Sequence, residues 1–492
     1  MLRLLNMFMA LPMMGVFIMA LPTFAQISPA QVWQDWQVQA KDFAGASVLG
    51  TVAPVAGNGL DIFDVVLRVK KDQSVFTVKV DKVELRQRGE AVQMTLSDEV
   101  SISLRIKGAP DSPPFTLLGS FTHPGLSQRI TRIGSETITT TTAQQFDFKL
   151  LSLNDVDIAA LGGRFEWKIR DLSTRNIYSQ TADQTQSSVF TAAGLAVAAK
   201  LSNFERDFGL TYLANMTDLM GTSNLSSSQG DWRFDYSGSQ SQIDGLDAGT
   251  TYAATSQSDQ GSLSVQSDGK RLLLRSHSGA QDVTLSSGSL PLSVVVMQNE
   301  KNYFELTFPY KVDPIAQRFA LKLGFDGLTV SPELWAVFDP QNILSQEPIG
   351  LNIDFGGKVI VAADLSNSGE VKSLAKEKSL PLFLKDFELH DLSLSALGAR
   401  LKVLGNLQFD IGSKLKKGDQ FLPTDGKILI DIYGLNATID GLVAAGLLPE
   451  ETVMGLRMMM GMFLRQANGE DHLTSSLSFA NRGFAVNGMQ IK

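Results

Sequence analysis

The chain has 492 residues, 43% of them hydrophobic, and a formal net charge of −8 at pH 7. This acidic balance argues against nucleic acid or an anionic membrane surface as the main partner. Cysteine is absent, which excludes a disulfide scaffold, a thiol enzyme and a lipoprotein acylated on cysteine.

Residues 1–25 have the layout of a secretory signal peptide. Arg3 precedes an apolar run from Leu4 to Leu21, and the small residues Thr23 and Ala25 follow. We therefore expect cleavage after Ala25 and a periplasmic protein. An uncleaved anchor is the alternative, because the run approaches the length of a bilayer span, but Pro12 and Gly15 interrupt the run and Pro22 follows it. No later segment is long and apolar enough, so we expect no transmembrane segment after cleavage.

Region 26–221 begins with an expected helix and continues as strands. Ser28 reads as an N-cap before Pro29, and Trp33 and Trp36 recur at helical spacing, with the helix ending near Gly45. The tryptophans fit a core stripe better than a docking surface. From residue 61 apolar residues alternate with polar ones, and the turns between these runs are short, which predicts antiparallel hairpins.

The rest of the chain divides into regions 222–290 and 291–492. The first is rich in Ser and Gly, yet alternating apolar residues such as Trp232 and Phe234 favour short polar strands over a flexible spacer. The second is predicted to hold strands, a helix that opens at Ser331-Pro332, and a helical pair. The first helix of the pair covers Leu435 to Leu447, and the second follows a break at Leu448-Pro449-Glu450 and extends to about Arg465. An Asn487-Gly488 turn closes it.

Three motifs carry a resemblance to a known family. VWQDWQ (32–37), SPELWAVFDP (331–340) and GLVAAGLLPEETVMGLRMMMGMFLR (441–465), followed by the final Asn-Gly turn, resemble a family of exported bacterial proteins, domain of unknown function 2125. The resemblance implies export and a largely β architecture, but no assigned activity. A looser likeness, at the level of fold, is to AsmA-like envelope proteins, which are associated with lipid handling.

Residues for chemistry are few. The four histidines lie in unrelated segments, and no phosphate-binding loop, nucleophile elbow or metal-ligand spacing is present. His390 stands beside Glu388 and Asp391, but strict strand alternation would place Asp391 on the opposite face, so we interpret it as a solvated strand histidine. We expect no enzyme activity, no cofactor and no metal site.

The least usual composition is the methionine cluster of the last helix. Val453, Leu456, Met460, Phe463 and Leu464 form one stripe. Met454, Met458 and Met462 fall at i, i+4 and i+8 beside that stripe and widen it. Such a wide, adaptable surface either covers a large sheet or contacts an apolar ligand. We therefore name Met454, Met458 and Met462 as candidate apolar-ligand residues.

Together these patterns predict a mainly β (α+β) protein of large antiparallel sheets, with a few amphipathic helices near the N-terminus and the C-terminus. The function that fits best is non-catalytic binding in the cell envelope, with a lipid or another apolar envelope component as partner. The alternatives are a periplasmic protein-binding scaffold or assembly factor, and a carboxylate-dependent envelope hydrolase. The sequence leaves the oligomeric state open.

Overall fold

The structure is a computed structural model that describes most of the chain after residue 26. The described residues are 27–42, 46–71, 74–107, 113–179, 185–203, 207–226, 229–288, 292, 294–367, 369–371, 373, 381–409, 423–467, 469–481 and 483–491. The predicted signal peptide lies outside them. None of the helices in these ranges combines the length and the hydropathy that a bilayer span requires.

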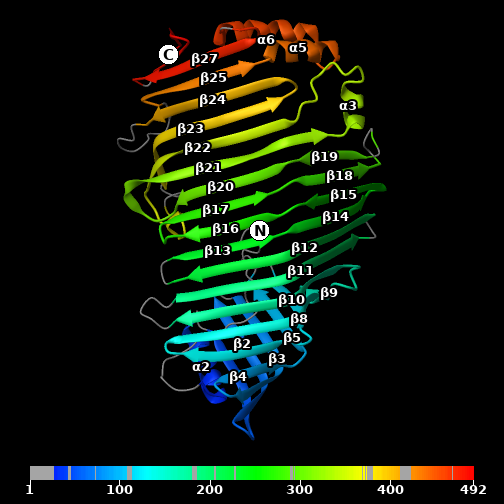
Figure 1. The fold of residues 1–492 in the computed structure, drawn as a ribbon, viewed down its shortest axis with the longest axis vertical. Coiled ribbons are helices and arrows are strands. Elements are labelled where there is room, and N and C mark those ends of the chain that lie inside the picture. Colours follow the sequence, from blue (N-terminus) through cyan, green and yellow to red (C-terminus); the bar gives the residue numbers. More distant parts are fainter. Residues whose placement is uncertain are drawn as a thin grey trace. The chain divides into compact units, whose positions relative to one another are not determined.

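The chain divides into two compact units, and antiparallel strands make up most of each (Figure 1). Unit 1 comprises Met1–Ser227 and Phe234–Thr251, and unit 2 comprises Ser228–Arg233 and Tyr252–Lys492. The prediction of a mainly β fold with large antiparallel sheet is confirmed. Strands also run through most of 222–290, where the Ser/Gly-rich composition could have indicated a spacer.

Unit 1 is a sheet in which two pairs of shorter strands, each pair placed end to end, lie between long strands. Its strands are β1 (Ser47–Val55), β2 (Gly59–Lys71), β3 (Ser74–Arg88), β4 (Ala91–Leu96), β5 (Glu99–Ile106), β6 (Phe115–Thr122), β7 (Ser127–Ile133), β8 (Glu136–Leu153), β9 (Val156–Asp157), β10 (Arg164–Ser179), β11 (Thr185–Asn203), β12 (Phe208–Leu225) and β14 (Gly238–Asp247). β13 (Gly230–Tyr236) is divided between the units. β3 pairs with both β4 and β5, and β8 pairs with both β7 and β6. From β8 the order continues β10, β11, β12, β14.

The long strands of unit 1 share a break in their alternation. Residues on the core side step by three instead of two at one point, for example from Ile62 to Val65 in β2 and from Ile169 to Leu172 in β10. The same step occurs in three more strands, at Val80/Val83 (β3), Ala192/Leu195 (β11) and Met216/Leu219 (β12). Side chains of a regular strand alternate between faces, so a step of three needs an irregular residue in between.

Three of these strands place an aspartate in the left-handed region at the step. Asp64 has φ 52°, Asp171 has φ 52° and Asp218 has φ 50°. Aspartate tolerates this region better than most residues with a Cβ. The ladders skip these positions: β8 pairs with β10 at Gln145↔Arg170 and next at Ala143↔Leu172. The irregular residues therefore keep both halves of each strand apolar on the same face.

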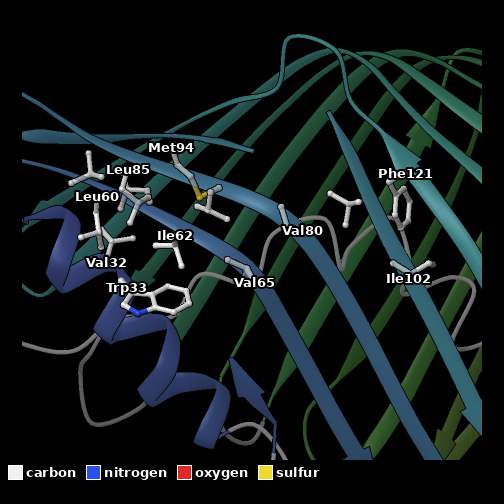
Figure 2. Packing of buried hydrophobic residues seen from close by; sticks show 14 of the residues in the cluster. Val32, Trp33, Leu60, Ile62, Val65, Val80, Leu85, Met94, Ile102 and Phe121 are labelled. Atoms are coloured by element: carbon white, nitrogen blue, oxygen red, sulfur yellow. The ribbon is translucent and has the colours of Figure 1, made fainter. Parts of the chain in front are cut away.

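The first helix packs on this apolar side, as its tryptophan spacing predicts. α2 (Pro29–Asp42) starts with a reciprocal cap, in which Gln31 N donates to Ser28 Oγ and Ser28 N donates to Gln31 Oε1. Trp33 is buried against Ile62 and Val65 (Figure 2), and Val32 is buried beside it. The core interpretation of Trp33 is confirmed. Asp35 of the same helix is also buried and accepts a 2.7 Å bond from Arg132 of β7.

Unit 2 repeats the long and short strand plan. Its strands are β15 (Thr250–Ser258), β16 (Gly261–Ser267), β17 (Arg271–Ser278), β18 (Gln281–Ser287), β19 (Val295–Asn299), β20 (Lys301–Pro309), β21 (Asp313–Val330), β22 (Ile349–Val361), β23 (Leu382–Ala396), β24 (Ala399–Gln408), β25 (Asp425–Tyr433), β26 (Arg465–Gln466), β27 (His472–Ala480), β28 (Gly483–Val486) and β29 (Met489–Gln490). β20, β21, β22, β23, β24, β25 and β27 lie side by side (Figure 1).

The helices of unit 2 begin where the sequence predicts. α3 (Pro332–Phe338) opens after Ser331, α5 (Leu435–Ala444) begins after Gly434, and α6 (Glu450–Phe463) follows the break at Pro449. α5 and α6 end two to three residues before the predicted limits. Asn487 and Gly488 both have positive φ and form the predicted turn between β28 and β29.

The role of the left-handed aspartates can be tested at Asp171. Asp171→Gly should leave the free energy of unfolding nearly unchanged, because glycine adopts positive φ without steric cost. Asp171→Val should lower it by about 1–2 kcal/mol, because a β-branched residue is strained there. Urea unfolding measures both, with Thr191→Val on the exposed side of neighbouring β11 as control. Equal losses for Gly and Val would contradict the conformational explanation.

Candidate binding surfaces

One face of the sheet from β20 to β27 in unit 2 is apolar. Two rows of apolar residues run across the strands, each residue directly opposite the next. One row is Phe304, Leu323, Ile353, Leu392, Val403 and Ile430, and the other is Phe325, Leu351, Leu394, Leu401, Ile432 and Leu473. We call these twelve residues the apolar face. Neither row contains a charged residue.

The apolar face is covered far less than its counterpart in unit 1. Of its residues only Val403 is buried, at 8% exposure, while Leu394 is 39% exposed and the others are half-buried. In unit 1 the corresponding residues Ile62, Val83 and Leu85 are 0–1% exposed. Large continuous apolar surfaces of this kind mark binding sites more often than ordinary protein surface does.

The opposite face of unit 2 is polar at the same strands. Tyr303 Oη donates to Asn352 Oδ1 at 2.7 Å, and the Asn352 amide donates to Asp391. Beside them Asp354 and Glu388 bond His390 at 3.0 and 3.2 Å. The two faces of the sheet therefore differ in chemistry, as expected when only one of them contacts an apolar partner.

His390 corrects one sequence interpretation. Strict alternation predicts that Asp391 faces away from Glu388 and His390. In the structure β23 has a bulge at His390: Leu389 pairs with Phe355, and Asp391 pairs with Asp354. The extra residue reverses the alternation, so Asp391 bonds Asn352 on the same polar face. The earlier placement of Asp391 was wrong because sequence periodicity cannot show a bulge.

The polar cluster around His390 does not have the geometry of a free general base. Nδ1 is bonded to Asp354 and Nε2 to Glu388, so both ring nitrogens already have carboxylate partners. These bonds raise the pKa of His390 above its ordinary value, which favours the charged imidazolium. Among the described residues no group of three or more His, Asp or Glu side chains is arranged to hold a metal ion.

The other histidines are placed singly. His277 bonds Ser262, and His472 bonds Asp431 and stacks on Tyr433 with ring centroids 4.0 Å apart. His123 is buried in unit 1, and this burial lowers its pKa below the ordinary value.

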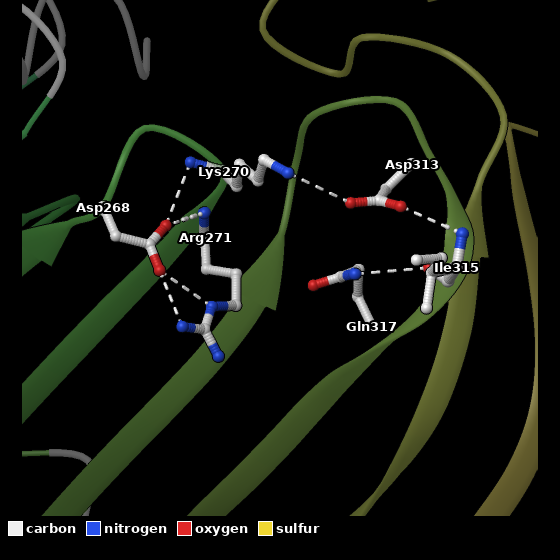
Figure 3. A network of polar contacts seen from close by, with 6 residues as sticks. All are labelled: Asp268, Lys270, Arg271, Asp313, Ile315 and Gln317. Carbon is white, nitrogen blue, oxygen red and sulfur yellow. Dashed lines mark hydrogen bonds and ion pairs between the residues drawn. The ribbon is translucent and has the colours of Figure 1, made fainter.

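A second polar network occupies the turn between β16 and β17 (Figure 3). Asp268 accepts bonds from the backbone N–H groups of Lys270 and Arg271 and from the Arg271 guanidinium at 2.9 and 2.7 Å. Lys270 Nζ lies 3.3 Å from Asp313, which also accepts a bond from Ile315 N. Both cations of this turn are paired with carboxylates, so the turn is not a basic site for an anion.

The predicted ligand residues of α6 lie together on its exposed side. Met454, Met458 and Met462 are 74%, 68% and 61% exposed. The interpretation that they cover the sheet therefore does not hold for these three side chains. Val453 is buried, and Leu456, Met460 and Leu464 are half-buried, as the stripe predicts. Phe463 departs from the stripe and is 45% exposed.

The end of α6 is attached beside the apolar face. Ser475 of β27 donates a 2.7 Å bond to Phe463 O, and Ser475 is opposite Ile430 in the ladder. Asn487 Nδ2 donates to the same carbonyl at 2.8 Å. Arg457 pairs with Asp440 and links α6 to α5. The C-terminal end of α6 is therefore bonded to the sheet beside Ile430, the last residue of one apolar row.

The chain matches no protein-family model, no curated protein and no solved structure. The resemblances to domain of unknown function 2125 and to AsmA-like proteins stay predictions.

Sequence reasoning identified the methionines but missed the apolar face. Each strand of the face carries alternating apolar residues, which is the available signal. Their assembly into two rows depends on long-range strand pairing, and no local pattern encodes that pairing.

The exposure of α6 predicts contrasting effects of two neighbouring substitutions. Met454→Asp should leave the melting temperature of the protein nearly unchanged, because the new carboxylate stays in water. Val453→Asp should destabilise the protein by several kcal/mol, because it buries an unpaired charge. Thermal melting followed by circular dichroism measures both. Cooperative loss of structure in Met454→Asp would show that this side of α6 is covered after all.

The histidines predict two opposite titrations. His390 should titrate above pH 6.5 and His123 below it, as followed by the imidazole signals in NMR spectra. The stability from His390 is present below pH 6.5 and is lost as pH rises through its raised pKa. His123 has a lower pKa in the folded protein than in the unfolded chain, so as the pH falls the unfolded chain binds this proton before the folded protein does. The free energy of unfolding therefore decreases as the pH drops below 6.5. Replacing Asp354 with Asn should bring the His390 titration back toward 6.5, and a titration that does not move would contradict the assignment.

Proposed function

We propose that this chain is an exported, non-catalytic protein of the cell envelope that binds the long apolar chain of a lipid along the apolar face of unit 2. The observation that carries the proposal is the half-exposed double row of apolar residues across the strands from β20 to β27. Export and a periplasmic location are supported by the signal-peptide pattern of residues 1–25.

The shape of the apolar surface suits an extended hydrocarbon. Neighbouring strands lie about 4.8 Å apart, so a row of six residues extends over roughly 24 Å, close to the length of a long acyl chain. The rows offer no hydrogen-bonding side chain, so binding depends on the apolar area removed from water. Each buried methylene contributes about 0.8 kcal/mol, so a chain of about sixteen carbons gains roughly 13 kcal/mol. Micromolar binding needs about 8 kcal/mol, which leaves about 5 kcal/mol to offset the entropy cost of association.

The test compares two adjacent residues of β25 that face opposite ways. Ile430 lies on the apolar face, whereas Leu429 is 40% exposed on the other side. Ile430→Gln should weaken binding of cis-parinaric acid, followed by its fluorescence, by about tenfold, because roughly 1.4 kcal/mol of apolar contact is lost. Leu429→Gln is the matched control and should bind as the wild type does.

Mass spectrometry of the protein isolated from its own cells adds the natural ligand. A co-purified lipid in the wild type, reduced in Ile430→Gln, is the expected result. No lipid in the wild type together with no binding of cis-parinaric acid would reject the proposal. Equal loss of lipid binding in Ile430→Gln and Leu429→Gln would show that binding does not use the apolar face.

A protein-binding scaffold is the second candidate, and the exposed methionines of α6 favour it. Met side chains adapt to varied apolar partners, and Met454, Met458 and Met462 form a continuous exposed strip. Under this alternative Met458→Asp would abolish assembly with a protein partner and leave cis-parinaric acid binding intact. Under the lipid proposal assembly is not required for binding.

A further inference from the structure

The apolar side of unit 1 gives way to uncharged polar side chains along part of β7, β8 and β10, and three of them lie in a line. Gln128 of β7 is directly opposite Thr141 of β8, and Thr141 is directly opposite Thr174 of β10. We call these three residues the polar notch. Met94 continues the line beyond Gln128, and Phe190 continues it beyond Thr174, so both ends are apolar.

The oxygens of the polar notch are buried and have no hydrogen-bond partner in the structure. This holds for Gln128 Oε1, Thr141 Oγ1 and Thr174 Oγ1. Gln128 and Thr141 as whole residues are only 2% and 1% exposed. Buried polar groups are nearly always bonded, and three unpartnered oxygens on adjacent strands indicate a group that the protein alone does not supply.

The surroundings define the charge of that group. Ile130 and Val92, the next pair along these strands, are both 0% exposed. Arg132, which shares the face of Gln128 and Ile130 on this strand, is bonded to Asp35 at 2.7 Å and to Thr137 Oγ1 at 3.5 Å. Thr139 and Asn176 continue the row of Ile130 and are also uncharged, so the surroundings of the polar notch are buried and neutral. An unpaired carboxylate or ammonium group would be strongly disfavoured there.

We propose that the polar notch binds the hydroxyl group of a neutral apolar ligand of the long-chain alcohol or acylglycerol class. A hydroxyl donates to the Gln128 carbonyl and accepts from a threonine hydroxyl, so one small group provides both kinds of bond. An ether or ester oxygen accepts but cannot donate, which leaves Gln128 Oε1 without a partner. The inference goes beyond the proposed function, because it assigns a second site for an apolar ligand within unit 1, apart from the apolar face of unit 2.

The binding test uses two probes that differ in a single donor, decan-1-ol and methyl decyl ether. Calorimetric titration of the full mature chain should show about tenfold tighter binding of the alcohol, the usual effect of one buried hydrogen bond. In Thr141→Val and Gln128→Met the ratio of the affinities for the alcohol and the ether should fall to nearly one. Thr142→Val is the matched control, because Thr142 is the next residue on the exposed side of β8 and should keep the preference.

Melting of the protein without ligand separates a ligand site from a site filled by water. Valine has the shape of threonine, so Thr141→Val and Thr174→Val should melt at the same temperature as the wild type or higher, because an unpartnered hydroxyl is removed. A lower melting temperature in both would show that internal water already bonds these hydroxyls, and this result overturns the proposal. Using both variants covers the case in which one of them fails to fold.

The outcomes distinguish this inference from the proposed function. Equal binding of decan-1-ol and methyl decyl ether overturns the polar notch but leaves binding of apolar chains intact. A preference for the alcohol that persists in Thr141→Val and Gln128→Met also overturns it. Failure of both probes to bind, together with failure of cis-parinaric acid, rejects the proposed function itself.

Discussion

The architecture depends on keeping the apolar residues of very long strands on one side of the sheet across an irregular residue. A strand of 16 to 19 residues, such as β10 (Arg164–Ser179) or β11 (Thr185–Asn203), accumulates twist, and an irregular residue that relieves it also reverses the side-chain alternation. The chain compensates by spacing its apolar residues three apart at that point. Ile169 and Leu172 thus reach the same core from the two sides of Asp171. Without this spacing, half of each strand would present its apolar residues to water.

The apolar side of the strands is covered to different extents in the two units. In unit 1 the helix α2 and a group of rings cover it, with Phe121, Phe148 and Trp167 in contact at centroid distances of 5.1 to 5.8 Å. In unit 2 the apolar face stays half-exposed, and the helices α5 and α6 attach at the end of the strands, with α5 contacting β24. A sheet with an uncovered apolar side gains stability from whatever covers it. An apolar ligand would therefore raise the stability of unit 2 as well as occupy it.

Local features of the fold were predictable from the sequence, whereas the relations between distant strands were not. Ser28, Ser331-Pro332 and Asn487-Gly488 mark element boundaries because capping and turn geometry depend on neighbouring residues alone. The step of three at Asp171 and the bulge at His390 were missed, because each is a single departure from the alternation of apolar and polar residues and cannot be told from an ordinary irregularity of the sequence. For α6 the width of the apolar stripe was predictable. Its exposure was not, because helical periodicity does not show which neighbour packs on it.

The chemistry of the two candidate sites follows from what each surface can discriminate. An apolar face selects ligands by area, since the hydrophobic effect has no direction, and chains of similar length bind with similar affinity. Hydrogen bonds in a dry environment discriminate more sharply, because a ligand that lacks the right group leaves buried protein atoms unpaired. Gln128, Thr141 and Thr174 of unit 1 therefore offer what Leu323 or Ile353 of unit 2 cannot provide, which is a choice between ligands of the same length. The polar notch needs no charge for this choice, and a neutral site avoids the desolvation cost that an ion would bring to the core of unit 1.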